Sequence, residues 1–381
     1  MKTEERLYTP GPTQIPQRIL RAISRPLIHH RSGEFKELFE GIRERLKYPF
    51  QTQNEIFILT SSGTGAMEAV IANLFSPGEK VLVIEGGKFG RRWTGISQAF
   101  GLDVVRLPVE LGEAADPEEA KGIVAKDKRI SAVLATLCET STGVVEDIQG
   151  LGRALQGSPT LLIVDAVSGL AVDELRPDEW GVDVVVSASQ KGLMLPPGLS
   201  FLSLSPRAKE RVEKSSSPRY YWDLREYEGF AQRGVTPYTP AISLFFGLQE
   251  VLSMFEEEGM EGVWARHKRL AQATRRGIEA LGLQPFSRRP SNGLTVVRIP
   301  ADLDGERLLE VLRSDFGVLL AHGQEELRGR IFRLAHMGWV AEGDILRVIG
   351  ALELALRKLG LQVAVGEGTG AAMDLLMGVN R

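Results

Sequence analysis

Three short segments of the chain combine residue types that could bind and process a small ligand. The first is Thr60-Ser61-Ser62-Gly63-Thr64-Gly65, where hydroxyls and glycines stand directly before a helical pattern. Backbone N–H groups at a helix N-terminus attract anions, most often phosphate. A serine N-cap followed by a tight turn would use the same residues, so both interpretations stay open. The glycines do not complete a dinucleotide fingerprint and no P-loop motif occurs, so one phosphate fits better than a pyrophosphate.

The other two segments follow apolar runs that are typical of buried strands. Asp165 directly follows Leu161–Val164, and Lys191 lies in Ser187-Ala188-Ser189-Gln190-Lys191-Gly192. A carboxylate at the C-terminal end of a strand lies where open α/β sheets bind ligands, although it could instead cap the turn that begins at Val167. A lysine placed against buried structure has a lowered pKa and can form a Schiff base with an aldehyde.

Together the three segments fit one cofactor, pyridoxal 5′-phosphate. This cofactor needs a cradle for its phosphate, a carboxylate against its pyridine nitrogen and a lysine for its aldehyde. The segment Thr60–Gly65, Asp165 and Lys191 supply these parts in that order along the chain. Each part alone is a weak signal, but their order and their placement at strand ends make the combination specific.

The elements that must position these groups are those of an α/β protein. Between the first two strands, Met67, Val70, Ile71 and Leu74 follow the helical period. The strands are continuously apolar, as expected when both faces of a sheet are covered, and they are predicted at Ile56–Thr60, Val81–Ile84, Val104–Leu107, Ala132–Leu137, Leu161–Val164, Val184–Ser187 and Leu199–Leu204. We therefore expect a mainly parallel sheet with helices on both faces. The connection before Leu199 is too short and proline-rich for a crossover helix, so the last strand is expected to run antiparallel.

The pattern changes after Pro240, where long helical segments predominate. Helices are predicted over Ala241–Phe255, Val263–Leu281, Gly305–Phe316 and Glu342–Leu359, and strands over Leu294–Ile299 and Ile331–Ala335. The expected division is an N-terminal arm (1–20), a large cofactor-binding domain (21–255) and a smaller C-terminal α+β domain (256–381). The final segment from Val363 onward has no clear period, and we expect a loose tail.

Length and composition limit the class of protein. The 381 residues suggest two domains at roughly 150 residues each. The 43% hydrophobic and 25% charged residues exclude disordered and fibrous classes, and the net charge of −3 does not indicate a nucleic-acid partner. One cysteine, Cys138, excludes a disulfide within the chain, and the histidines show no metal-ligand spacing. No apolar run approaches the ~18 residues of a membrane span, and we expect a cytoplasmic protein with no metal and no membrane partner.

The chain resembles the class V pyridoxal-phosphate-dependent aminotransferases of the alanine–glyoxylate / serine–pyruvate type over nearly its whole length. The resemblance is carried by Thr9-Pro10-Gly11-Pro12, His29-His30-Arg31, Ser62-Gly63-Thr64-Gly65, Glu139-Thr140-Ser141-Thr142-Gly143, Asp165, Ser189-Gln190-Lys191-Gly192, Thr239-Pro240-Ala241 and Phe332-Arg333-Leu334. It implies the fold of fold-type I pyridoxal-phosphate transferases and a homodimer with active sites at the subunit interface.

The resemblance also implies roles for single residues. Lys191 would be the Schiff-base lysine and Asp165 the partner of the pyridinium nitrogen. Phe89 would stack on the cofactor ring, where many relatives have tryptophan, and Thr140 would face the phenolic oxygen. The phosphate would be held by Ser62, Gly63, Thr64 and Gln190. A hydroxyl of Thr236, with Tyr238 or Thr239 as alternatives, would reach the phosphate of the neighbouring subunit.

Arg333 matches the arginine that binds the substrate α-carboxylate in that family. In Ile331–Ala335 the two-residue period of a strand places Ile331, Arg333 and Ala335 on one face. An arginine buried there needs an anionic partner. The alternative to a substrate carboxylate is a salt bridge to a carboxylate at the domain interface, such as one near Glu325-Glu326.

The expected function is transfer of an amino group from a small amino acid, alanine or serine, to a 2-oxo acid, glyoxylate or pyruvate. The mechanism would be ping-pong, with Lys191 as Schiff base and proton shuttle. The alternatives are a pyridoxal-phosphate lyase or a phosphonate transaminase on the same fold, or a non-catalytic subunit of a larger complex. Cys138 could suggest a cysteine desulfurase, but its place at a strand end favours a buried apolar cysteine.

Overall fold

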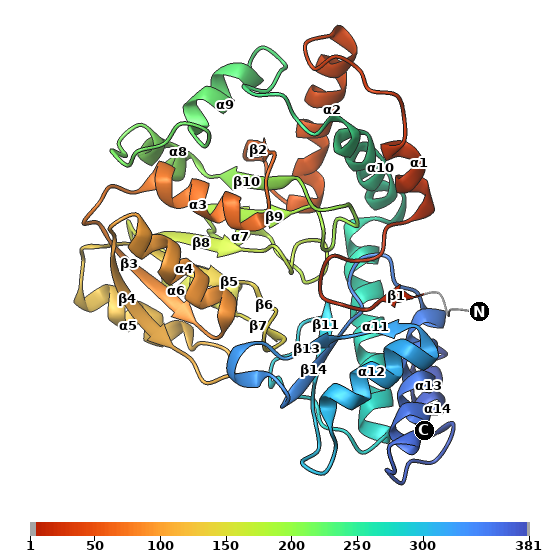
Figure 1. Cartoon of the computed structure of the whole chain (residues 1–381). Coiled ribbons are helices and arrows are strands. Elements are labelled where there is room, and N and C mark those ends of the chain that lie inside the picture. Colours follow the sequence, from red (N-terminus) through yellow and green to blue (C-terminus); the bar gives the residue numbers. More distant parts are fainter. Residues whose placement is uncertain (1–4, 379–381) are drawn as a thin grey trace.

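The computed structural model describes residues 5–378, which are built around a seven-stranded sheet (Figure 1). The strand order is β2 (Ile56–Leu59), β10 (Ser200–Leu204), β9 (Val184–Ala188), β8 (Leu161–Asp165), β5 (Ile130–Thr136), β3 (Lys80–Glu85) and β4 (Asp103–Pro108). Only β10 runs antiparallel to its neighbours in this sheet. The mainly parallel sheet and the reversed last strand predicted from the sequence are both confirmed.

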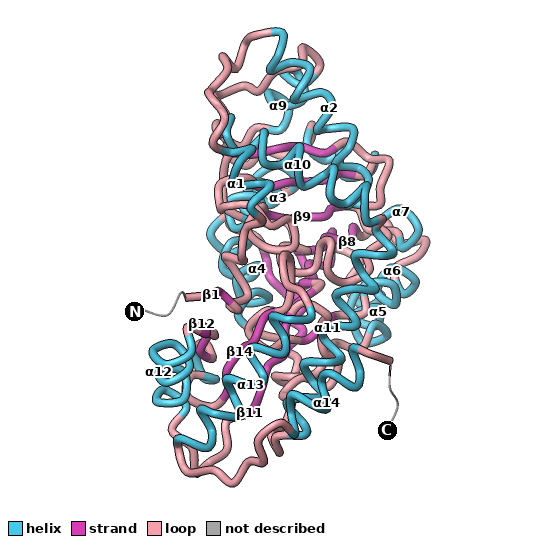
Figure 2. Tube along the Cα trace, turned by 90° about the vertical axis from the view of Figure 1, so that its right-hand side faces the viewer, coloured by secondary structure: helices cyan, strands magenta, loops and turns pink. Residues whose placement is uncertain are grey.

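Helices cover both faces of this sheet, which Figure 2 views nearly edge-on. One face packs against α3 (Gly63–Leu74), α4 (Lys88–Ala99), α8 (Pro206–Val212) and α9 (Leu224–Ala231). The other packs against α2 (Gly33–Phe50), α5 (Pro117–Lys126), α6 (Ile148–Ala154), α7 (Pro177–Trp180) and α10 (Ile242–Glu258). Within β8, Leu161 and Ile163 point to the first face and Leu162 and Val164 to the second. Apolar residues at every strand position therefore follow from burial on both sides.

The C-terminal part has its own sheet and its own core. Its three strands run antiparallel in the order β11 (Leu294–Arg298), β14 (Ile331–Ala335) and β13 (Ala321–His322). Its helices are α11 (Met260–Ala280), α12 (Gly305–Phe316), α13 (Glu342–Lys358) and α14 (Glu367–Leu376). Near the N-terminus, β1 (Arg6–Leu7) pairs in parallel with β12 (Val318–Leu319), and the chain then runs through Tyr8 toward the large sheet.

The expectation of a loose C-terminal tail is wrong for Glu367–Leu376. This segment is the helix α14, which packs on α11 and α13. Ala372 is fully buried there, and the carboxylate of Glu353 accepts hydrogen bonds from the N–H groups of Gly366 and Thr369 at 3.1 and 2.7 Å. The tail looked irregular because glycines interrupt its helical period, and the docking depends on residues of other helices. Residues 379–381 lie outside the described part.

The division of the chain at residues 20 and 255 stays a prediction. The first of these positions falls inside α1 (Gln17–Ile23) and the second inside α10. Side chains of α11 as far as Trp264 belong to the core of the large sheet, whereas Leu270, Ala273 and Ile278 of the same helix belong to the C-terminal core. No helix among residues 5–378 is both long and apolar enough to cross a lipid bilayer.

Candidate active site

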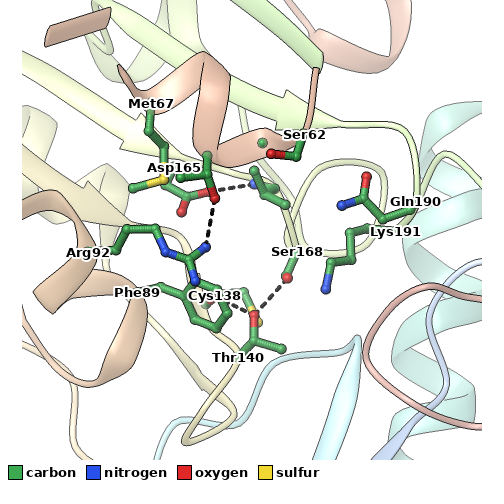
Figure 3. Close-up of a pocket in the computed structure, with 13 residues that line it drawn as sticks. Ser62, Met67, Phe89, Arg92, Cys138, Thr140, Asp165, Ser168, Gln190 and Lys191 are labelled. Carbon is green, nitrogen blue, oxygen red and sulfur yellow. Dashed lines mark hydrogen bonds between the residues drawn. The ribbon is translucent and has the colours of Figure 1, made fainter. Parts of the chain in front are cut away.

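One pocket lies at the carboxyl ends of the parallel strands, where Asp165 closes β8 and Lys191 follows β9 (Figure 3). It is lined by Ser62, Gly63, Thr64, Met67, Phe89, Arg92, Cys138, Thr140, Asp165, Val167, Ser168, Gln190 and Lys191. Eight predicted site residues are thus brought together from five separate stretches of the chain. Thr236 and Arg333 do not line this pocket.

Lys191 forms hydrogen bonds with the segment Pro10–Thr13 near the N-terminus. Its Nζ donates a hydrogen bond to the carbonyl of Pro10, and its own carbonyl accepts one from the hydroxyl of Thr13 at 3.1 Å. Gly11 has φ +125°, and a Cβ at this position would collide with the end of the Lys191 side chain, so glycine is required there. Burial lowers the pKa of the Lys191 amine to about 8, which leaves a sizeable share of neutral, nucleophilic amine near neutral pH.

Asp165 is 3% exposed and faces the pocket. Burial raises the pKa of its carboxyl to about 6, while a hydrogen bond from the Val167 N–H and the charges of Arg92 and Lys191 act in the opposite direction. The Val167 bond is 2.8 Å long, so the turn-capping alternative is realised by one oxygen. Among residues 5–378 no other hydrogen-bond donor reaches this carboxylate. It therefore retains the capacity to bind a cation, such as a protonated ring nitrogen.

The N-terminus of α3 forms a cradle with unused polar groups. Ser62 is the N-cap residue, yet its hydroxyl makes no capping hydrogen bond, so the interpretation as an ordinary serine cap does not describe it. A Cβ on Gly63 would lie 2.7 Å from the Val167 side chain, so only glycine allows this close approach. In the described part of the chain, the buried amide oxygen of Gln190 has no hydrogen-bond partner. An ordered water would satisfy the oxygen of Gln190, and a phosphate oxygen would accept a hydrogen bond from the hydroxyl of Ser62.

Glu139, which the sequence interpretation did not select as a site residue, fixes the wall on the Phe89 side. Its Oε2 accepts hydrogen bonds from the N–H groups of Phe89 and Gly90 at 2.9 and 3.0 Å. Its Oε1 accepts one from the N–H of Ser141 at 3.1 Å. A carboxylate at the N-terminus of α4 also suits the helix dipole. Because Glu139 and Phe89 are 50 positions apart, no local pattern could have revealed this contact.

Arg92 is a second residue that sequence reasoning missed. Its Nη1 donates a hydrogen bond to the hydroxyl oxygen of Thr64 at 3.1 Å. Its guanidinium carbon lies 4.7 Å from the centre of the Phe89 ring. The only local signal was its position three residues after Phe89, one turn along the same helix. Thr140 also lines the pocket, and its hydroxyl donates a hydrogen bond to Ser168 Oγ at 2.7 Å.

Arg333 lies in β14 and is 6% exposed. As the strand period predicts, Ile331 and Ala335 pack in a different cluster from Phe332 and Leu334. The guanidinium donates from Nε to the carbonyl of His322 at 2.9 Å and from Nη1 to that of Thr140 at 3.1 Å. Burial lowers the pKa of Arg333 to about 10, and the charge of Glu139 opposes this shift.

The salt-bridge alternative for Arg333 is wrong as stated. Glu325 and Glu326 instead form ion pairs with Arg91, at 2.5 and 3.0 Å. Within the described part of the chain, no carboxylate lies at ion-pair distance from Arg333. Among residues 5–378 the hydrogen-bond partners of this guanidinium are neutral carbonyls, and it remains able to grip a carboxylate with both arms.

Thr236 lies apart from the pocket. Its side chain is buried and its hydroxyl donates to the carbonyl of Tyr238 at 2.7 Å. Arg31 donates to the carbonyls of Thr236 and Pro237 at 2.7 and 3.3 Å, so this loop is firmly held. Thr239, in contrast, is exposed. The hydroxyl of Thr236 would have to leave Tyr238 before it could contact another subunit.

Cys138 and the histidines show no metal site. Cys138 is 2% exposed, and burial raises the pKa of its thiol far above the usual range, so it is not a reactive thiolate. No group of three or more potential metal ligands comes together among residues 5–378.

The chain is similar in sequence and in structure to known proteins over most of its length. Residues 7–335 match the family model described as "Aminotransferase class-V". The chain is 40% identical over 382 residues to the "Soluble hydrogenase, small subunit" of Synechococcus sp. (strain PCC 6716), with 99% of each chain covered. It is 37% identical to the "L-aspartate--glyoxylate aminotransferase" of Paracoccus denitrificans, with 98% of this chain and 96% of that protein covered. The crystal structure of ureidoglycine-glyoxylate aminotransferase from Bacillus subtilis superposes with a TM-score of 0.94 at 29% identity, over 99% of this chain and 98% of that one.

Proposed function

Starting from the fact that this chain belongs to the class-V aminotransferases, we propose that it is a pyridoxal-phosphate-dependent transaminase for small substrates. The donor would be a small amino acid, alanine or serine, and the acceptor a 2-oxo acid, glyoxylate or pyruvate. The family implies the cofactor, and the residues around the pocket supply the groups that the cofactor requires.

One observation carries this proposal. Lys191, with its lowered pKa, and the buried carboxylate of Asp165 line the same pocket as the open hydroxyl of Ser62 at the α3 N-terminus. An amine, a carboxylate and a phosphate cradle are the three attachments that pyridoxal phosphate needs. The unpartnered amide oxygen of Gln190 in the described chain and the glycine at position 63 also fit a ligand held close to the backbone.

The residues would divide the work of the reaction. When bound, pyridoxal phosphate supplies a ring that accepts the electrons released at the substrate Cα. Asp165 would hold a proton at the ring nitrogen, because an opposite charge at contact distance raises a base's pKa by ~1–3 units. Lys191 would bind the aldehyde carbon through Nζ and, after the substrate amine displaces it, move the proton between Cα and C4′.

The remaining residues would orient the reactants. Phe89 would cover one face of the ring, and the hydroxyl of Thr140 would donate a hydrogen bond to the phenolic oxygen in place of its bond to Ser168. Arg333 would grip the substrate carboxylate and so turn the Cα–H bond toward Lys191. The arm at Pro10 and Gly11 would exclude water on the Lys191 side.

The names of two relatives support the proposed acceptor, whereas they do not agree on the donor. The Paracoccus and Bacillus proteins are both named for glyoxylate, whereas their donors differ. A small oxo acid therefore has support from two relatives. We propose a ping-pong sequence in which glyoxylate or pyruvate accepts the amino group left on the protein by the first substrate.

A non-catalytic role in a larger complex is the alternative from another class. The name of the Synechococcus relative favours it. A protein that served only as scaffold would have no physical reason to keep a buried arginine without a carboxylate partner, as Arg333 is within residues 5–378, because this costs free energy. A lyase or a phosphonate transaminase would use the same lysine and carboxylate, and only turnover separates them.

The test is a half-reaction followed by visible absorption. The purified protein with pyridoxal phosphate should be yellow, and a donor amino acid without acceptor should bleach the band and release one equivalent of oxo acid. Glyoxylate or pyruvate should then restore the band. A panel with alanine, serine and aspartate identifies the donor. A protein that forms no visible band is not this enzyme, and continued product formation without an acceptor would indicate a lyase.

We also infer that the protein is a homodimer. The support is the resemblance of Thr236–Pro240 to a segment that reaches the phosphate of a neighbouring subunit. Of the hydroxyls in this loop, that of Thr236 is engaged with Tyr238 and Thr239 is exposed, so the loop presents Thr239 more readily to a second copy.

A further inference from the structure

Arg92 is a cation in the pocket wall that makes no ion pair with any residue from 5 to 378. It is half-buried, donates to the hydroxyl oxygen of Thr64 and lies over the ring of Phe89 (Figure 3). The adjacent Arg91 differs in both respects, because it is exposed and pairs with Glu325 and Glu326. Two neighbouring arginines thus have opposite surroundings, and only Arg92 offers its charge to a ligand.

The charges of the pocket do not balance a bound phosphate without Arg92. A phosphate monoester carries a charge of about −1.5 to −2 at neutral pH, and a helix N-terminus supplies roughly +0.5. Among the side chains that line the pocket, Lys191 and Arg92 are the cations. The proposed function uses Lys191 for the aldehyde, which leaves Arg92 as the remaining positive charge.

We propose that Arg92 is a further residue of the phosphate cradle and supplies its positive charge. The inference rests on the proposed function and names one more residue that binds its cofactor. The hydroxyl oxygen of Thr64 accepts a hydrogen bond from Arg92, so its O–H group is free to donate a hydrogen bond to a phosphate oxygen. The guanidinium also contacts Phe89, which links the phosphate end of the cofactor site to the residue beside its ring.

The experiment compares ligands with and without the phosphate. Arg92→Met keeps the packing on Phe89 but removes the charge, Arg92→Lys restores a charge, and Arg91→Met is the matched control one residue away. Dissociation constants are measured by calorimetry for pyridoxal phosphate, pyridoxal and inorganic phosphate, on protein from which the cofactor has been removed. Thermal unfolding followed by circular dichroism verifies that each variant is folded.

If Arg92 makes a charge-assisted hydrogen bond to the phosphate, Arg92→Met should raise the dissociation constants of pyridoxal phosphate and inorganic phosphate by about 10- to 100-fold. Pyridoxal should bind nearly as before, Arg92→Lys should recover part of the loss, and Arg91→Met should match the wild type. Equal losses for pyridoxal phosphate and pyridoxal would mean that Arg92 acts on the ring through Phe89, and the proposal would be wrong. Unchanged affinities for all three ligands would also overturn it.

The two proposals fail in different ways. A wild-type protein that forms no visible band with pyridoxal phosphate refutes the proposed function. If the same protein binds inorganic phosphate and loses this binding in Arg92→Met, the cradle is still an anion site and the role of Arg92 stands. If the visible band forms but Arg92→Met binds pyridoxal phosphate normally, the function survives and the inference about Arg92 does not.

Discussion

The guanidinium of Arg333 donates a hydrogen bond through Nη1 to the main-chain oxygen of Thr140, 3.1 Å away. This bond joins β14 of the C-terminal sheet to the wall of the pocket, because the hydroxyl of Thr140 lines that wall. Both hydrogen-bond acceptors of Arg333, at Thr140 and His322, are neutral carbonyls. The guanidinium is therefore fixed in position while its charge stays available to an anion from solution.

Arg333→Lys should lower kcat/KM for amino acids by on the order of 10²-fold, or about 3 kcal/mol, because lysine keeps the charge but loses the planar two-armed grip. Steady-state kinetics on the best donor measures the effect. Cofactor affinity and thermal stability should change little. The exposed Arg330→Lys, three residues earlier, is the control. A variant that unfolds readily or keeps normal kcat/KM would show that the substrate carboxylate is bound elsewhere.

Lys191→Ala should abolish both the visible band and the borohydride-stable attachment of the cofactor, since no other amine lines the pocket in the described chain. Turnover should be lost with it. Peptide mapping after borohydride reduction of the wild type identifies the modified lysine. Lys121→Ala, on the exposed surface of α5, should behave as wild type. Label on any lysine other than Lys191 contradicts the assignment.

Asp165→Asn should inactivate the enzyme yet stabilise the protein without cofactor. The pKa of Asp165 is about 6 in the folded state, above the value of about 3.9 expected when unfolded. Ionisation of Asp165 therefore lowers the stability of the folded state. This free-energy cost grows as the pH rises from about 4 to 6, and above pH 6 it reaches about 3 kcal/mol. Urea unfolding at neutral pH should show the variant to be more stable.

The gain from Asp165→Asn should disappear near pH 4, where the Asp165 carboxyl of the folded wild type is protonated and its burial no longer costs a charge. Asp302→Asn, at an exposed position, controls for the loss of one negative charge. A stability gain that does not depend on pH would mean that burial of this charge is not its cause.

Ala372→Asp should destabilise the protein by about 3 kcal/mol or more, because a carboxylate would be buried where α14 meets α11 without a partner. Ala372 is fully buried, whereas the adjacent Met373 is 42% exposed. Met373→Asp is therefore expected to unfold at nearly the wild-type temperature. Equal melting temperatures for the two variants would show that α14 is not docked in solution.

Sedimentation analysis should find a dimer at assay concentrations if the loop Thr236–Pro240 contributes to a neighbouring site. Specific activity should fall on dilution below the dimer dissociation constant, because each site would lose a hydroxyl from its partner. Thr239→Ala and Thr236→Ala, assayed side by side, identify the hydroxyl that matters. A fully active monomer excludes the shared site.

Much of the candidate site could be predicted from local sequence, for a physical reason. The carboxyl ends of parallel strands meet at one edge of a sheet, so polar residues placed after buried strands converge there. Asp165, Lys191 and the segment around Gly63 all follow this rule, and they line one pocket. The resemblance to the class V aminotransferases, stated on those motifs, is confirmed by the match over residues 7–335.

The tertiary structure alone decided the contacts between distant segments. Glu139 accepts hydrogen bonds from the Phe89 backbone, and Arg91 forms ion pairs with Glu325 and Glu326. The helix α14 docks on α11 although its own sequence has no clear period. Local periodicity reports which face of an element is buried, but it carries no information on which distant partner covers that face or satisfies its polar groups. The placement of the site residues at strand ends follows from the sequence. That Arg92 and Arg333 have no carboxylate partner within residues 5–378 follows only from the fold.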